Sequence, residues 1–219
     1  MRDLRRRTIT GLLYAAVVLA AAFGPAIVFT VLVAVALGVA LGELWDLRRA
    51  GIVAAVELLA LLAGSYSLFV LRSLGDRGAA HGAAAGLPVW LLLAIGATWA
   101  ADVGAYAIGS VAGRRKIAPR ISPGKTWEGT FGGFGAAALA VLGIGALLGL
   151  GRPEAAVAAL TIGPAAFAGD LLESLLKRRA GVKDSGALFP GHGGMLDRID
   201  SLVVVAPLVA LLGSGMMVR

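Results

Sequence analysis

Two pairs of carboxylates stand out in the sequence because the members of each pair are three residues apart. Asp170 and Glu173 lie in FAGDLLES, and Asp197 and Asp200 lie in HGGMLDRIDS. Residues three apart share one face of a helix, so each pair would present two carboxylates to the same neighbour. Oxygen ligands without cysteine and with little histidine favour Mg²⁺ or Mn²⁺ over zinc. The pairs therefore predict a hard-cation site; the alternative is that they neutralise neighbouring lysines and arginines.

Basic residues and glycines around these carboxylates suggest what such a cation would hold. Cations beside a carboxylate-bound metal suit a polyphosphate, because both neutralise the charge that develops during transfer. Glycines let backbone N–H groups approach phosphate oxygens. The basic residues are Lys125, Lys177, Arg178, Lys183 and Arg198, and the glycines are Gly191, Gly193 and Gly194. His192, between two of these glycines, is a candidate for phosphate contact or proton transfer; the alternative is a solvated side chain.

Two other catalytic patterns are rejected. Gly124-Lys125-Thr126 ends like a P-loop, but the position of its first glycine holds Pro119, and no strand is expected before it. Ser122 and Ser174 lack the histidine and aspartate partners of an acyl-transfer nucleophile. We therefore expect phosphate chemistry without a protein nucleophile.

The composition places this chemistry in a membrane. Of 219 residues, 58% are hydrophobic and only 15% are charged, the mean hydropathy is +0.87, and there is no cysteine. So few charges could not cover the apolar surface of a soluble protein, and disordered chains are poor in apolar residues. Disulfides and thiolate metal sites are excluded. The net charge of +7 is interpreted first as a topology signal and then as an affinity for anionic lipid or phosphate, not for nucleic acid.

Apolar runs predict an all-α, polytopic helical bundle with about seven transmembrane helices, within a range of six to nine. A spanning helix needs about 20 mostly apolar residues. The basic N-terminus followed by an apolar run resembles a signal peptide, but we expect no cleavage because another apolar run follows at once. The predicted spans are 8–23, 26–41, 52–71, 87–108, 130–150, 155–172 and 202–218.

The basic residues are sorted between the two sides of this layout. With the N-terminus in the cytoplasm, sixteen of the 20 lysines and arginines fall in cytoplasmic segments, which is a strong positive-inside bias. The four outer ones are Arg72, Arg77, Arg152 and Arg219. The bias supports an odd number of spans in the cell (inner, cytoplasmic) membrane, with the functional loops facing the cytoplasm.

We expect one membrane domain over residues 1–219, with hydrophobic spans in 1–85 and a catalytic region in 86–219. Two long basic loops rich in glycine, proline and serine, 109–129 and 177–201, fall on the cytoplasmic side. Loops carry function where a rigid scaffold positions them. Two more carboxylates lie within apolar runs, where an ionisable group is costly. Asp102 is a functional candidate, whereas Glu57 is interpreted as an interfacial carboxylate or the partner of a neighbouring arginine.

The stretch SLLKRRAGVKDSGALFPGHGGMLDRID, residues 174–200, closely resembles the signature of the phosphatidate cytidylyltransferases, or CDP-diacylglycerol synthases. We call these residues the signature segment. Every fixed position of the family pattern S-x-φ-K-R-x4-K-D-x-[GSA]-x2-φ-[PG]-x-H-G-G-φ-x-D-R-φ-D, with φ apolar, is matched. SPGKTWEG, DVGAYAIG and GDLLES resemble three further family stretches. The resemblance covers residues 102–200.

The resemblance implies an enzyme that transfers the cytidylyl group of CTP to phosphatidate, giving CDP-diacylglycerol and pyrophosphate. It implies a divalent metal, Mg²⁺ or Mn²⁺, with a second, monovalent cation such as K⁺ in some members, and a homodimer. Carried over to this chain, the metal candidates are Asp170, Asp197, Asp200, Asp102 and Glu173. The phosphate and CTP candidates are Ser122, Lys125, Thr126, Lys177, Arg178, Lys183, Asp184, Gly193, Gly194 and Arg198. Glu128 would orient Lys125 or a water.

Three alternatives are weighed against this interpretation. A cation pathway would use Glu57, Asp102, Asp170 and Glu173, but these carboxylates cluster at one end and do not cross the bilayer. A CDP-alcohol phosphotransferase would carry D-G-x2-A-R, which the sequence does not contain. A relative acting on an archaeal ether lipid phosphate would share the head-group chemistry, so the motifs leave diacyl and ether lipids open.

Overall fold

The computed structural model describes residues 2–76, 87–147, 151–189 and 193–217. Seven α-helices run through these residues, and each overlaps one predicted span. They are α1 (Arg2–Phe23), α2 (Ala26–Asp46), α3 (Ile52–Asp76), α4 (Val89–Ala112), α5 (Trp127–Leu147), α6 (Arg152–Ala180) and α7 (Leu196–Met217), with a short 3₁₀ helix, η1 (Arg48–Ala50). Within this part of the chain α2 to α6 are long and apolar enough to cross a membrane, and α1 contributes a shorter apolar helix. The predicted helical membrane bundle is confirmed.

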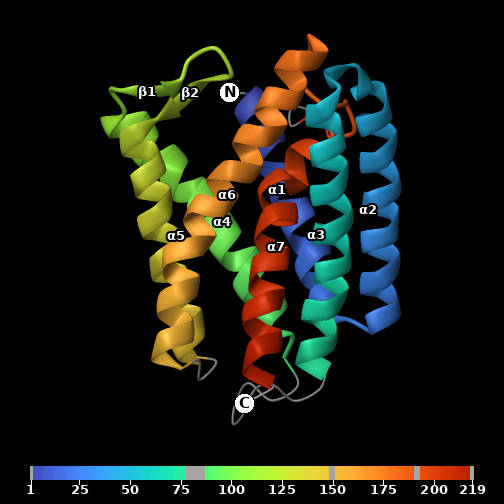
Figure 1. Cartoon of the computed structure of the whole chain (residues 1–219), viewed down its shortest axis with the longest axis vertical. Helices are drawn as coiled ribbons and strands as arrows, with labels where there is room; N and C mark the ends of the chain where they lie inside the picture. Colours follow the sequence, from blue (N-terminus) through green and yellow to red (C-terminus); the bar gives the residue numbers. More distant parts are fainter. Residues whose placement is uncertain (1, 77–86, 148–150, 190–192, 218–219) are drawn as a thin grey trace.

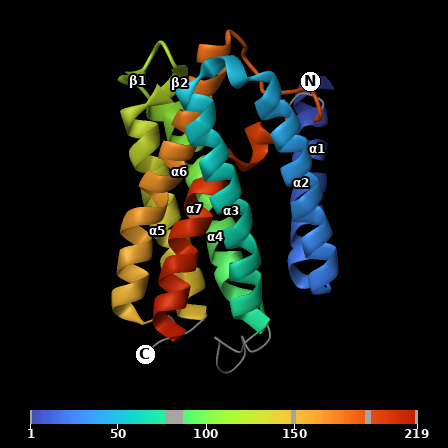
Figure 2. The same cartoon turned by 45° about the vertical axis from the view of Figure 1, so that its right-hand side comes forward.

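The helices pack around a central α4. Figure 1 shows α5 and α6 on one side of it and α3 and α7 on the other, and Figure 2 shows α1 and α2 as a pair at the edge of the bundle. The most extensive contact joins α4 to α5. A side chain at Gly104 would meet the Cβ of Ala136, and one at Gly133 would meet the backbone oxygen of Ala101. These glycines therefore let the two helices approach closely.

Two buried apolar clusters hold the bundle together. The larger cluster joins residues of all seven helices and includes Leu91, Val141 and Ile162. The smaller cluster lies where α2, η1, α3, α6 and α7 meet, and it includes Leu176 and Leu196. Because Leu176 and Leu196 flank the loop between α6 and α7, the smaller cluster fixes the two ends of the predicted functional loop.

Four predicted boundaries were wrong because helices extend into both predicted loops, and one of them is the start of α5, at Trp127 rather than residue 130. Helix α4 continues to Ala112, and α6 continues to Ala180 rather than stopping near residue 172. Gly181 ends α6 in the left-handed conformation (φ 77°), where the N–H groups of Gly181 and Val182 donate to the carbonyls of Arg178 and Lys177. This glycine cap, not the onset of charge, determines where the helix stops. Helix α7 begins at Leu196, so most charged residues of the predicted loop 177–201 lie on helices.

The loop between α4 and α5 contains an antiparallel hairpin, which corrects the purely α-helical prediction. Strand β1 (Lys116–Ala118) pairs with β2 (Ser122–Thr126), with Lys116 opposite Thr126 and Ala118 opposite Ser122. The Ile121 N–H donates to the Ala118 carbonyl and closes the turn. Pairing across a few polar residues leaves no hydrophobic alternation in the sequence. A strand does precede Gly124-Lys125-Thr126, contrary to expectation, but Pro119 still breaks the P-loop pattern.

The segments predicted to share one side of the membrane gather at one end of the bundle. The start of α1, the turn at η1, the β-hairpin and the loop after α6 all lie there (Figures 1 and 2). We call this the loop end. The hairpin and the signature segment both lie at this end. The basic segments that indicate the orientation in the membrane are therefore close to the candidate site.

The close contact between α3 and α7 can be tested at Gly64. A methyl group there would lie 2.5 Å from the Cα of Val203, whereas a methyl group at Gly38 of α2 meets nothing within 4 Å. We expect Gly64→Ala to cost roughly 1–3 kcal/mol because the backbone of α7 must shift. Gly38→Ala should be neutral or slightly stabilising. Thermal unfolding midpoints of the purified proteins check this; equal midpoints for the two variants would contradict the packing described here.

Candidate active site

A cavity of about 1100 Å³ opens at the loop end, between the hairpin, the signature segment and helices α4 to α7. Its size exceeds the usual range of small-ligand pockets, roughly 300–1,000 Å³. Most predicted site residues line it, although they come from segments far apart in the sequence. Those residues are Asp102, Ser122, Lys125, Thr126, Asp170, Glu173, Lys177, Lys183, Asp184, Gly193, Asp197, Arg198 and Asp200.

Asp197, in the first turn of α7, is held by four hydrogen bonds. Its Oδ2 accepts from the Ser185 N–H (2.9 Å), the Ser185 hydroxyl (2.8 Å) and the Gly194 N–H (2.8 Å), and its Oδ1 accepts from Lys177 Nζ (2.5 Å). Burial acts to raise the pKa of this carboxyl, but the ammonium and backbone donors outweigh burial and hold the pKa below its ordinary value. Asp197 is therefore a fixed anion at the cavity wall.

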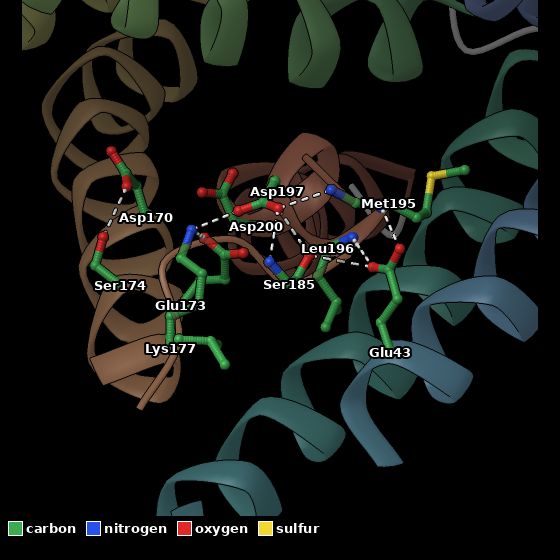
Figure 3. Close-up of polar contacts among 12 residues, drawn as sticks. Glu43, Asp170, Glu173, Ser174, Lys177, Ser185, Met195, Leu196, Asp197 and Asp200 are labelled. Carbon is green, nitrogen blue, oxygen red and sulfur yellow. Dashed lines mark hydrogen bonds and ion pairs between the residues drawn. The ribbon is translucent and has the colours of Figure 1, made fainter. Parts of the chain in front are cut away.

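Lys177 joins α6 to α7 at the same point (Figure 3). Its ammonium lies 2.7 Å from Glu173 Oε2 and 2.5 Å from Asp197 Oδ1, and the side chains of Glu173 and Asp197 are only 1% and 7% exposed. Glu173 and Lys177 are four residues apart, which places them on one helix face. The extension of α6 past residue 172 is thus what brings Lys177 into the site.

Asp170 and Lys125 form a second ion pair, between α6 and the hairpin. The Lys125 ammonium also lies 5.0 Å from the centroid of the Phe167 ring, an arrangement that favours a cation over an aromatic face. The Ser174 hydroxyl lies 3.5 Å from Asp170 Oδ1. The Asp170 side chain is 40% exposed and lines the cavity, so this ion pair is accessible to a ligand.

Three carboxylates of the cavity interact electrostatically with one another: Asp102 from α4, Asp170 from α6 and Asp200 from α7. Gly169 allows this approach, because a side chain at that position would meet the Asp200 carbonyl. The described lining residues comprise six carboxylates and four lysine or arginine side chains. The cavity wall thus carries two more carboxylates than cations.

The donor set suits a divalent cation in charge and ligand type. An excess of two carboxylates matches one divalent ion, and Glu173 Oε1 is buried with no hydrogen-bond partner among the described residues. Hard cations prefer such oxygen ligands. In the part of the chain that is described, however, no three acidic or histidine side chains converge closely enough to form a metal cage. A metal would therefore need the carboxylates to exchange their present partners.

Several predicted site residues have structural contacts. Glu128 Oε2 accepts from the N–H groups of Arg114 (3.0 Å) and Arg115 (3.2 Å), so it anchors the start of the hairpin rather than Lys125. Thr126 lines the cavity, and its hydroxyl accepts from the Gly129 N–H (3.2 Å), which caps α5. Arg178 is exposed beside the cavity, where it donates to the carbonyls of Ile121 and Val182.

The signature glycines divide between the described and undescribed parts of the loop. Gly193 has φ 80°, and a side chain there would meet the Asp197 carboxylate, so glycine is required at this position. Gly194 donates its N–H to the same carboxylate. Gly191 and the predicted catalytic candidate His192 lie outside the described residues.

Glu57 differs from its prediction. It is 1% exposed, it interacts electrostatically with Lys177 rather than with an arginine, and its Oε2 has no hydrogen-bond partner in the described part of the chain. A lysine thus takes the place of the expected arginine partner, and the side chain is enclosed by the bundle, in which α3 packs against both α6 and α7. Glu57 belongs to the buried surroundings of Lys177.

Two polar residues of the site were missed by sequence reasoning. Ser185 bridges two carboxylates, with its hydroxyl 2.8 Å from Asp197 Oδ2 and 3.2 Å from Glu43 Oε2. Glu43, near the end of α2, also accepts from the N–H groups of Met195 and Leu196. Glu43 lies just after the predicted span 26–41, and no local spacing links it to partners about 150 positions away.

Comparison with known proteins decides the family. A model of the cytidylyltransferase family matches residues 58–215, which include the central helices, the hairpin and the whole signature segment. The chain belongs to the cytidylyltransferase family. The matched region contains every predicted site residue, but it leaves out α1, α2 and Glu43.

Individual relatives match this chain over part of their length. A phosphatidate cytidylyltransferase of Pseudomonas aeruginosa is 45% identical over 117 residues, 52% of this chain and 43% of the relative. One of Synechocystis is 48% identical over 130 residues, 54% of this chain and 41% of the relative. The uncharacterized protein YnbB of Escherichia coli is 51% identical over 122 residues, 55% of this chain and 40% of that protein. The match thus spans about two fifths of each relative.

The buried position of Lys177 gives a testable consequence for stability. Lys177→Met would leave Glu173 and Asp197 without their common cation, which costs about 3–5 kcal/mol for a buried pair. Arg179, two residues further along α6, is exposed, and Arg179→Met should change the stability by less than about 0.5 kcal/mol. Thermal unfolding of both purified variants measures the difference. A Lys177→Met protein as stable as Arg179→Met would show that the ion pairs do not hold α6 to α7.

Proposed function

We propose that this chain transfers the cytidylyl group of CTP to phosphatidate, which yields CDP-diacylglycerol and pyrophosphate. The observation that carries the proposal is the cavity at the loop end, where the hairpin lysine, the signature segment and the acidic helix ends of a cytidylyltransferase meet. Polar groups for a nucleotide and a lipid phosphate lie at the ends of apolar helices, where a substrate from the bilayer meets one from water.

The chemistry needs no protein nucleophile. A phosphate oxygen of the lipid attacks the α-phosphorus of CTP, a new phosphorus–oxygen bond forms, and the bond to the β-phosphate breaks, releasing pyrophosphate. The barrier is the repulsion between negatively charged phosphates, which positioned cations lower. Lys125, Lys183 and Arg198 line the cavity and are the groups we assign to phosphate. Lys125 would exchange Asp170 for a phosphate oxygen when substrate arrives.

We infer that the enzyme depends on Mg²⁺, which Mn²⁺ could replace, held by Asp170, Asp197 and Asp200, with Asp102 and Glu173 as neighbours. The excess of carboxylates along the cavity and the unpaired Glu173 oxygen support this assignment. When bound, the metal would neutralise phosphate charge. A second, monovalent cation such as K⁺ belongs to the same proposal on the family resemblance alone.

We further propose seven transmembrane helices in the cell's inner membrane, with the N-terminus and the active site facing the cytoplasm. The gathering of the basic segments at one end of the bundle supports this orientation through the positive-inside rule (Figure 1). A homodimer is also proposed, on the family resemblance and on the glycine-rich helices that allow close packing between copies.

Asp197→Asn tests the catalytic assignment. Asparagine keeps the shape and one accepting oxygen but removes the charge, so we expect turnover of CTP with phosphatidate to fall by roughly 100-fold or more. Its amide must face other donors, so we also expect a lower unfolding midpoint in a protein that still folds. Release of pyrophosphate by purified protein measures the turnover, and gel filtration with thermal unfolding measures folding. Asp46→Asn, at an exposed carboxylate near the end of α2, is the matched control. Full activity of a folded Asp197→Asn protein would remove Asp197 from the site.

Chelation tests the metal. With EDTA in excess, formation of CDP-diacylglycerol should stop, and added Mg²⁺ should restore it, because the carboxylates then regain their counter-ion.

The same assay is run with a diacyl and with an ether lipid phosphate, which separates the two lipid classes that the motifs leave open. Flux of cations into liposomes without CTP is measured in parallel. Turnover that persists in EDTA would contradict the metal, and CTP-independent flux without turnover would favour the cation pathway.

A further inference from the structure

A carboxylate outside the family-matched region holds the signature segment in place. Glu43 lies near the loop end of α2, whereas the family match begins at residue 58. Figure 3 shows its side chain pointing from α2 toward the start of α7. Its Oε1 accepts from the Met195 N–H at 2.9 Å, and its Oε2 accepts from the Leu196 N–H at 2.9 Å. Both carboxylate oxygens therefore bind the first backbone donors of α7.

This contact provides hydrogen-bond acceptors for backbone N–H groups at the start of α7. The first N–H groups of a helix have no partner within the helix, and an anion near them is also favoured by the helix dipole. Around the start of α7 the chain reads Gly194, Met195 and Leu196. None of these side chains has an oxygen that could accept a hydrogen bond from the first N–H groups of the helix. Met195 and Leu196 are buried, so water does not replace the cap. Glu43 supplies it from another helix.

The signature segment is shaped around the Glu43 carboxylate. A side chain at Gly186 or at Gly194 would collide with the Glu43 oxygens. The absence of a side chain at each of these two glycines leaves the space that the Glu43 carboxylate occupies. The close fit is a second observation, beside the hydrogen bonds, that the half-buried Glu43 carboxylate packs against the loop.

Ser185 connects Glu43 to the catalytic candidate Asp197. The Ser185 hydroxyl lies 3.2 Å from Glu43 Oε2 and 2.8 Å from Asp197 Oδ2, and the Ser185 N–H donates to Asp197 at 2.9 Å. A hydroxyl has one hydrogen, so it donates to one carboxylate at a time. Ser185 thus lies against both carboxylates, and its hydroxyl can donate to either of them.

We propose that Glu43 is a positioning residue of the active site: it fixes the start of α7 and the Ser185 turn, so that Asp197 faces Lys177 at the cavity wall. Through Glu43, the N-terminal helix α2 becomes part of the surroundings of the site. Helix α1 supplies a second contact, since the Tyr14 hydroxyl lies 3.4 Å from the Arg198 carbonyl and its ring packs edge-on against Phe189. The consequence for turnover rests on the proposed cytidylyl transfer; the consequence for the start of α7 does not.

The test compares Glu43→Gln with Asp46→Asn, which removes an exposed carboxylate three residues further along the same helix. A glutamine has one accepting oxygen and a donor amide, so at least one N–H of α7 loses its partner. We expect faster hydrogen exchange in peptides containing Met195 and Leu196, a fall in kcat of about 10- to 100-fold, and a KM for CTP that changes by less than about threefold. Asp46→Asn should match the wild type in all three.

Ser185→Ala separates the two parts of the role. It breaks the hydroxyl link to Asp197 but leaves both backbone contacts of Glu43, so we expect kcat to fall with little change in exchange at Met195 and Leu196. Unchanged exchange in Glu43→Gln would overturn the proposal, and so would raised exchange with an unchanged kcat, since Glu43 would then be only a structural cap. An inactive wild type would contradict the proposed reaction alone, because the exchange measurement still decides whether Glu43 holds the start of α7.

Discussion

The structure of the site depends on one ammonium group shared by two carboxylates. Lys177 lies between Glu173 and Asp197, and both carboxylate side chains are almost fully buried. Buried charges of this kind are tolerated only when they are paired, because removing them from water is costly. Lys177 leaves this triad with an excess of one negative charge, and Glu57 and Asp200 lie within its electrostatic reach. Carboxylates therefore outnumber the cation around this lysine.

Other elements bring further cations to these carboxylates. The hairpin brings Lys125 to Asp170, and the signature segment brings Lys183 and Arg198 to the same cavity. The helices must then stop at this level, which Gly181 achieves for α6. Close packing at Gly169 brings α6 and α7 together where their carboxylates lie. Backbone features without charge therefore determine where the charges meet.

Hydrophobic runs and charge sorting were enough to predict the seven helices of the described chain and the end at which the charges gather. They could not predict the ends of α4 and α6, because a cap such as Gly181 or a hairpin such as 116–126 is decided by local backbone contacts. The stretches that resemble the family identified the charged lining residues, including Asp102 and Lys183. It could not separate residues that face the cavity from those that brace it. Arg178 and Glu128 occur in the same motifs, but they bind backbone groups.

Glu43 shows why such bracing escapes sequence reasoning. Its partners lie about 150 residues away, and the backbone N–H groups that it binds belong to every residue type except proline, so no residue pattern is required of them. Only the glycines opposite the carboxylate restrict the sequence, and glycines in the signature segment are readily attributed to phosphate binding instead. Gly194 serves the Glu43 contact and the Asp197 hydrogen bond at once. A motif glycine can therefore be required by a half-buried carboxylate of another helix even when it lies next to the substrate cavity.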